Sequence, residues 1–227
     1  VVGDVDPKRV RELAERYFGR IPGGPKPEPL RTVEPPQEAE RRVTMWLPAQ
    51  RMVLMGYHKP DINHPDDAVY DAIGSLLSEG RSSRLYRGLV RDRKVATQVA
   101  GFPGLPGQKY PGLFIFFAMT APGRTNQEVE KAIEEELGRL IREPVSKEEL
   151  DGVKRRARAS LLRQLDDNLG LAIQLSSIQA LTGDWRNLFR QLDKINAVTP
   201  EDIQRVARAT FTRTNKTVAV IEPLESR

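Results

Sequence analysis

The run Leu113-Phe114-Ile115-Phe116-Phe117-Ala118-Met119 is the clearest strand signal in the sequence, and it decides the class of fold. Seven consecutive apolar residues, three of them aromatic, are typical of a strand buried inside a sheet. Residues 42–47 alternate between polar and apolar side chains, and residues 51–57 are apolar enough for a second buried strand. Residues 95–99 and 216–221 are also rich in strand-forming residues. These runs predict the strands of one sheet.

Helical periodicity fills most of the remaining sequence. A capping box at 146–149 predicts a helix that runs to Leu165, and residues 199–202 predict a last helix that ends near Phe211. Adjacent strands combined with a block of helices predict an α+β fold, in which helices pack on one face of a mainly antiparallel sheet. The other predicted helices cover residues 6–19, 63–79, 83–93, 125–141, 166–181 and 185–195.

Two further features complete this outline. Glycine and proline are frequent between residues 101 and 112, and this composition predicts a loop between two strands. Ser82 or Ser83 is expected to cap the helix that begins near residue 83, because serine hydroxyls accept hydrogen bonds from free backbone N–H groups at a helix start.

The chain divides into three parts on composition. Prolines crowd the stretch 21–40, and such segments behave as semi-rigid extended spacers, so we predict an interdomain linker there. Residues 1–20 are then the tail of a preceding domain, and residues 41–227 form the main domain. The opening Val1-Val2-Gly3-Asp4 has no initiator Met and no signal-peptide pattern, so we expect the sequence to be a cut from a longer protein.

Charge and composition exclude several classes of function. The net charge is +5, from 36 Lys and Arg against 31 Asp and Glu, but the two signs are interleaved along the predicted helices. Mixed charge of this kind is typical of a solvated surface, so nucleic-acid binding is not favoured. The absence of cysteine excludes disulfides and thiolate chemistry. The sequence contains no apolar run of the ~18 residues that a membrane-spanning helix needs.

No catalytic or metal-binding constellation emerges from the residues. His58 and His64 are the two histidines, whereas a zinc site needs three or four ligands, so the predicted metal ligands are none. Residues 80–84, Gly-Arg-Ser-Ser-Arg, lack the second glycine of a nucleophile turn. The acidic pairs lie at helix starts or on polar helical faces, where carboxylates favour the helix dipole. The predicted catalytic residues are therefore none.

Several segments, in order, resemble the pitrilysin/insulinase family of zinc metallopeptidases, the inverzincins. Taken together they cover essentially the whole chain, and residues 80–86 with the following Leu89 and Val95-Ala96 are the most specific match. The beginning resembles the end of that family's N-terminal metal-binding domain, and the rest resembles its C-terminal non-catalytic domain. The other matching segments are 1–7, 16–22, 53–56, 64–66, 199–203 and 218–221.

The resemblance carries specific implications for function. Family members hold zinc through H-x-x-E-H and a downstream Glu in the N-terminal domain, and this chain contains no such motif. The resemblance thus implies no cofactor in this chain and a zinc ion in a missing N-terminal domain or a partner subunit. The expected partners are that metal-binding part and an unstructured peptide substrate, and a dimer is compatible with the resemblance. The sequence leaves the compartment unknown; the cell envelope or periplasm would suit the resemblance.

Two positions depart from the family pattern. In many members the second domain supplies an Arg and a Tyr that hold the substrate backbone and the oxyanion. By the resemblance these positions fall on Val90 and Thr97, which do not match; Arg87 and Arg91 lie nearby without a Tyr partner at the family's spacing. The resemblance therefore leaves the substrate-binding residues unknown.

Two functions remain in competition on the sequence alone. The chain is either the C-terminal part of a zinc endopeptidase, closing its chamber and helping to bind peptide, or a non-catalytic assembly subunit of the same fold. In both cases we expect the chain alone to be inactive.

Overall fold

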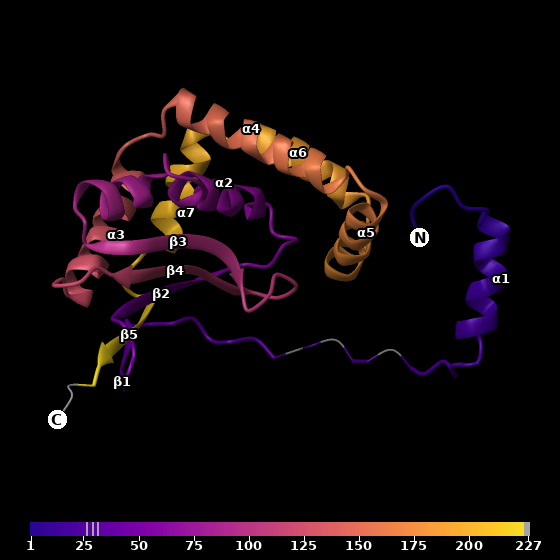
Figure 1. The fold of residues 1–227 in the computed structure, drawn as a ribbon, viewed down its shortest axis with the longest axis horizontal. Helices are drawn as coiled ribbons and strands as arrows, with labels where there is room; N and C mark the ends of the chain where they lie inside the picture. The colour runs from indigo at the N-terminus through magenta and orange to yellow at the C-terminus, as the bar shows by residue number, and fades with distance from the viewer. Residues whose placement is uncertain (26, 29, 31, 225–227) are drawn as a thin grey trace.

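The computed structural model describes residues 1–25, 27, 28, 30 and 32–224 and contains one five-stranded sheet (Figure 1). The strand order is β1-β5-β2-β4-β3; β1 pairs in parallel with β5, and all other neighbours are antiparallel. The elements are α1 (Pro7–Phe18), β1 (Arg41–Leu47), β2 (Met52–Lys59), α2 (Asp67–Ser78), the π-helix η1 (Tyr86–Asp92), β3 (Ala96–Leu105), β4 (Gly112–Thr120), α3 (Asn126–Arg142), α4 (Lys147–Gln164), α5 (Asn168–Thr182), α6 (Asn187–Ala197), α7 (Pro200–Thr210) and β5 (Lys216–Pro223).

Helices α2, α3 and α7 pack on one face of this sheet, which confirms the predicted α+β architecture. Met55 on β2 and Phe116 on β4 are fully buried in this layer. The Phe116 ring lies 6.1 Å from that of Tyr57 and 5.7 Å from that of Phe211, centroid to centroid. Burial of such apolar area is the main force that holds the helices to the sheet.

The predicted capping box and the predicted cap of the last helix are both present. The Ser146 hydroxyl accepts a hydrogen bond from the Glu149 N–H, and Glu149 accepts one from the Ser146 N–H at 3.1 Å. Thr199 and Asp202 form the same reciprocal pair at the start of α7. Each box satisfies backbone donors that have no partner inside the helix, so each fixes where its helix begins.

The predicted loop at residues 101–112 is wrong in its first part, because β3 continues to Leu105. Gly101 lies opposite Phe116 in the β3–β4 pair. A Cβ atom on Gly101 would lie 2.5 Å from the Phe116 ring, closer than atoms can approach. The glycine therefore makes room for an aromatic ring within a strand and does not mark a turn.

The expected serine cap is also wrong. The helical segment after residue 83 has no side-chain cap, and it is a π-helix from Tyr86 to Asp92. The Ser83 hydroxyl is buried and has no hydrogen-bond partner among the described residues. Helical character was predicted correctly here, but the capping residue was not.

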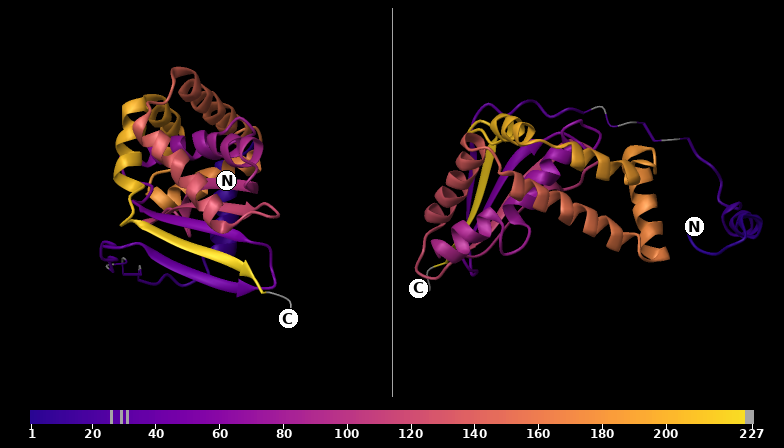
Figure 2. Two further views of the ribbon diagram at one scale, coloured as in Figure 1. Left: turned by 90° about the vertical axis from the view of Figure 1, so that its left-hand side faces the viewer. Right: turned by 90° about the horizontal axis from the view of Figure 1, so that it is seen from above.

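Helices α4, α5 and α6 form an arm that extends away from the sheet (Figure 2). A second, smaller core joins them around Ile62, Ile178 and Leu188. Gly183 ends α5 in the left-handed conformation with φ 81°, which favours glycine at a helix end.

Helix α1 lies apart from the sheet, beyond the end of this arm (Figures 1 and 2). It has no buried residue, and Tyr17 and Phe18 are exposed. Between α1 and β1, the described residues contain neither helix nor strand. The division into tail, linker and main domain remains a prediction. No described helix combines the length and apolar character that crossing a membrane requires.

Candidate functional site

The face of the sheet opposite α2, α3 and α7 is apolar and partly exposed. On β2 and β4, Leu54 lies opposite Phe117, and both side chains point away from the helices. On the neighbouring strands, Met45 is 40% and Phe102 45% exposed. We call this surface the open face; its partly exposed members are Val43, Met45, Leu47, Met52, Leu54, Phe102, Leu113, Phe117 and Met119.

An uncovered apolar sheet face is unusual for an antiparallel sheet. Such sheets ordinarily carry polar side chains on the face that water reaches. Contiguous exposed apolar surface of this kind marks a place where another molecule or domain binds. The open face is therefore a candidate docking surface.

Strand β1 forms one edge of the sheet and adds free backbone groups to this surface. It pairs only with β5 among the described strands, and all seven of its residues are exposed. The largest side chain of the strand, that of Trp46, belongs to a residue that is 60% exposed. An unpaired strand edge can accept an extended peptide through backbone hydrogen bonds.

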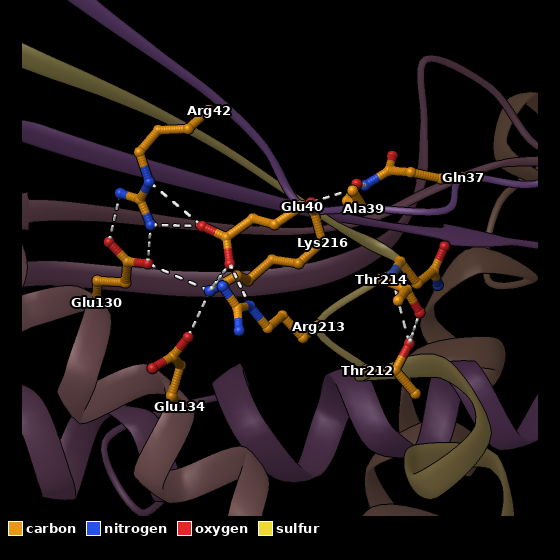
Figure 3. A network of polar contacts seen from close by, with 11 residues as sticks. Gln37, Ala39, Glu40, Arg42, Glu130, Glu134, Thr212, Arg213, Thr214 and Lys216 are labelled. Carbon is orange, nitrogen blue, oxygen red and sulfur yellow. Dashed lines mark hydrogen bonds and ion pairs between the residues drawn. The ribbon is translucent and has the colours of Figure 1, made fainter.

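A network of ion pairs attaches the end of the predicted linker to this edge of the sheet (Figure 3). Lys216, at the start of β5, is only 6% exposed. Its ammonium group lies 3.0 Å from Glu40, 3.3 Å from Glu130 and 2.6 Å from Glu134. Arg42 bridges Glu40 and Glu130 at 2.8 and 2.5 Å. The network therefore ties residue 40, directly before β1, to α3 and β5.

The electrostatics of this network favour charged carboxylates. Burial opposes ionisation of Glu130, yet the hydrogen bond from Arg42 and the charge of Lys216 hold its pKa below the usual value. Burial likewise opposes ionisation of Glu40, and hydrogen bonds from Lys216 and Arg42 outweigh it to lower the pKa. Paired charges of this kind serve as structure, and every carboxylate has a cationic partner, so no free acid or base is left for catalysis.

Val90 and Thr97, the two residues that differ from the family's Arg and Tyr, lie on neighbouring elements. Val90 in η1 is half-buried against the main core, and Thr97 on β3 is exposed, with its hydroxyl donating to the Met119 carbonyl at 3.4 Å. Arg91 forms an ion pair with Asp92 at 2.6 Å. Neither Val90 nor Thr97 can supply a cation, and their correspondence to the family's Arg and Tyr stays a prediction.

The two histidines do not form a metal centre. His58 lies on β2, whereas His64 lies in the turn before α2, where its Nδ1 accepts a hydrogen bond from the Asp66 N–H at 3.1 Å. Within the described residues, no group of three His, Cys, Asp or Glu side chains is arranged to hold a metal ion. The residues of this part of the chain therefore do not fit a zinc ion.

The fold agrees with comparison to known proteins. The sequence model described as the peptidase M16 inactive domain matches residues 1–157. The chain belongs to the peptidase M16 inactive-domain family. The resemblance to a zinc metallopeptidase family's non-catalytic domain is thereby confirmed.

Individual relatives agree with this assignment. The zinc protease PqqE of Helicobacter pylori is 28% identical over 98% of this chain and 50% of its own length. A protease structure from Helicobacter pylori matches with a TM-score of 0.88, 26% identity, and 98% of this chain against 54% of that one. An inactive peptidase domain from Bordetella parapertussis matches with a TM-score of 0.70 and 29% identity, covering 78% of this chain and 93% of that one. The chain thus spans about half the length of the curated relatives it matches.

Sequence reasoning missed the open face as a functional feature. The signal was present in residues 113–119, whose continuous apolar character places apolar side chains on both faces of β4. The ion-pair network left no comparable signal, because its members Glu40, Glu130 and Lys216 are far apart in the chain.

Proposed function

We propose that this chain is the non-catalytic half of a zinc endopeptidase and that its open face is covered by the metal-binding half and by bound peptide. The open face carries this proposal, because an inactive domain with a sheet face that water only partly reaches needs a partner to complete it. The zinc ion, held by the other half, would activate the water that attacks the peptide bond.

The residues of this chain would contribute binding and shielding. The apolar side chains of the open face would exclude water from the space between the halves. The free edge of β1 would hold an extended peptide by backbone hydrogen bonds, which give affinity with little sequence selectivity. Residues 1–20, with the exposed apolar side chains of Tyr17 and Phe18, would belong to the metal-binding half, and the stretch 21–40 would link the two.

The test compares this chain with a preparation that joins it to a metal-binding half bearing H-x-x-E-H. We expect hydrolysis of an unstructured peptide by the joined protein, its loss on adding a zinc chelator, and no hydrolysis by this chain alone. Chelator-resistant hydrolysis by the isolated chain would contradict the proposal. A stable assembly without peptidase activity would instead support the assembly-subunit alternative.

Substitutions in the joined protein test the surface itself. Leu54→Glu with Phe117→Glu places two charges on the open face and should weaken both assembly and turnover at least about tenfold, because a buried unpaired charge is costly. The matched control is Leu162→Glu with Leu169→Glu, at exposed positions on α4 and at the start of α5 (60% and 69% exposed). Equal losses in the two variants would mean that the open face has no special role.

A further inference from the structure

A concave surface lies on the helical side of the molecule, away from the open face. It is a hollow of about 580 Å³ between the start of η1, the end of α3 and the first half of α4. This volume falls within the range of ~300–1,000 Å³ that is usual for small-ligand sites. The charged residues that line it are Glu79, Arg84, Arg87, Arg139, Glu143, Glu148, Glu149, Arg155 and Arg156.

Three of the lining arginines are neutralised by glutamates. Arg84 binds Glu149 through two hydrogen bonds of 2.9 Å each. Arg156 pairs with Glu79 at 3.1 Å, and Arg139 pairs with Glu143 at 3.6 Å. These pairs shape the wall of the hollow but leave it little net charge.

Two arginines of the lining form no ion pair in the part of the chain that the structure describes, although the charge of Arg87 acts on Asp92. Arg87 comes from η1 and Arg155 from α4; both are exposed, and neither forms an ion pair with a described residue. Among the lining carboxylates, that of Glu148 has no arginine partner, so one negative charge offsets part of the positive charge of these two arginines. The hollow therefore has an excess of unpaired positive charge, supplied by two different helices that face the same space.

Two other residues that line the hollow, Ser83 and Arg84, have unused hydrogen-bonding capacity. Arg84 is 9% exposed, and its Nη1 has no hydrogen-bond partner among the described residues. The neighbouring Ser83 hydroxyl is 4% exposed and is also without a partner there. Buried polar groups without partners are rare in folded proteins, and each one costs free energy until a ligand or water satisfies it.

From the unpaired Arg87 and Arg155 beside the unsatisfied Ser83–Arg84 wall, we infer that this hollow binds an oxyanion. Guanidinium groups recognise planar carboxylates and tetrahedral phosphates through paired hydrogen bonds, so both chemistries suit the site. The anion is either a free one, such as phosphate, or the carboxylates of an acidic peptide. This inference does not depend on the peptidase function, because the hollow lies outside the open face and the β1 edge.

Calorimetric titration of the full chain tests the site with three probes: inorganic phosphate, triglutamate with acetylated and amidated ends and, as an uncharged control, triglutamine capped in the same way. We expect saturable binding of phosphate or triglutamate and none of triglutamine. Binding of phosphate alone would identify a free-anion site, and binding of triglutamate alone would identify a peptide site. Absence of binding to both anions at up to about 10 mM would overturn the inference.

The variants separate a built site from general surface charge. Arg87→Gln with Arg155→Gln should weaken anion binding at least about tenfold, since both unpaired cations are lost. The control, Arg158→Gln with Arg163→Gln, removes two exposed arginines of α4 that do not line the hollow, and should change the affinity less than about twofold. Similar weakening in both double variants would show that the anion binds only to net charge, and would also overturn the inference.

Discussion

The two faces of the sheet are built from the same kinds of side chain and have different surroundings. On β4, Phe116 points to the helices and is completely buried, whereas its neighbour Phe117 points to the open face and stays partly exposed. On β2, Met55 is likewise buried against the helices, whereas Leu54 is partly exposed on the open face. The composition of a strand therefore does not reveal which face its own chain covers.

The stability of the isolated chain and the binding role of its surface therefore depend on different faces of the sheet. The helix-covered face holds the domain together through tightly packed apolar contacts. The open face contributes less to the free energy of folding, because its side chains are only partly buried. They would be fully buried only when the metal-binding half of the proposed enzyme covers them. Substitutions on the covered face should therefore mainly lower the stability of the isolated chain, and substitutions on the open face should mainly affect assembly with a partner.

The largest expected effect is on the covered face. Phe116→Ala should lower the free energy of unfolding by about 3–5 kcal/mol, because it empties a fully buried site that contacts Tyr57 and Phe211. Phe117→Ala should cost about 1 kcal/mol in the same chain, because its site is only partly buried. Urea unfolding followed by circular dichroism measures both. Equal losses would break the contrast between the two faces.

The ion-pair network gives the next largest effect. Lys216→Met should destabilise the chain by about 2–4 kcal/mol, because Glu130 and Glu40 lose a buried cationic partner. Arg213→Gln is the control: its side chain is 89% exposed and 3.9 Å from Glu40, so we expect less than about 0.5 kcal/mol. If Lys216→Met is neutral in urea unfolding, the network does not stabilise the attachment of residue 40.

Sequence patterns predicted most of the fold because the deciding interactions are local. The capping boxes at Ser146 and Thr199 and the apolar run 113–119 each determine structure within a few residues. The strand at Gly101 was missed because its cause, the Phe116 ring, lies on another strand. The network around Lys216 and the hollow beside Arg84 were missed for the same reason, since tertiary folding alone brings their residues together.

The Arg84–Glu149 pair in the helical layer predicts a pH dependence. The Arg84 guanidinium, aided by the Ser146 N–H against partial burial, lowers the pKa of Glu149 to about 2. A lowered folded-state pKa gives stability that is present above the ordinary Glu pKa and is lost as the pH falls toward 2. We expect this loss to be about 1–2 kcal/mol after allowance for the partial exposure of Glu149, and to be absent in Glu149→Gln. Unfolding at pH 6 and at pH 2.5 checks it, and identical pH profiles for the two proteins would contradict it.

The smallest expected change in stability is at the free edge of the open face. Met45 is 40% exposed and lies on β1, whose outer edge pairs with no described strand. Met45→Lys should alter the free energy of unfolding by less than about 0.5 kcal/mol, because lysine can keep its stem along the sheet and its charge in water. The same charge should reduce any self-association of the isolated chain through the open face, since a lysine there would be buried without a partner when two apolar faces meet. Sedimentation velocity over a concentration series measures this, with Thr44→Lys as the control on the other face of the same strand. If both variants associate like the original chain, the open face does not drive contact between molecules. If only Met45→Lys disperses the chain, the apolar open face drives contact between its copies.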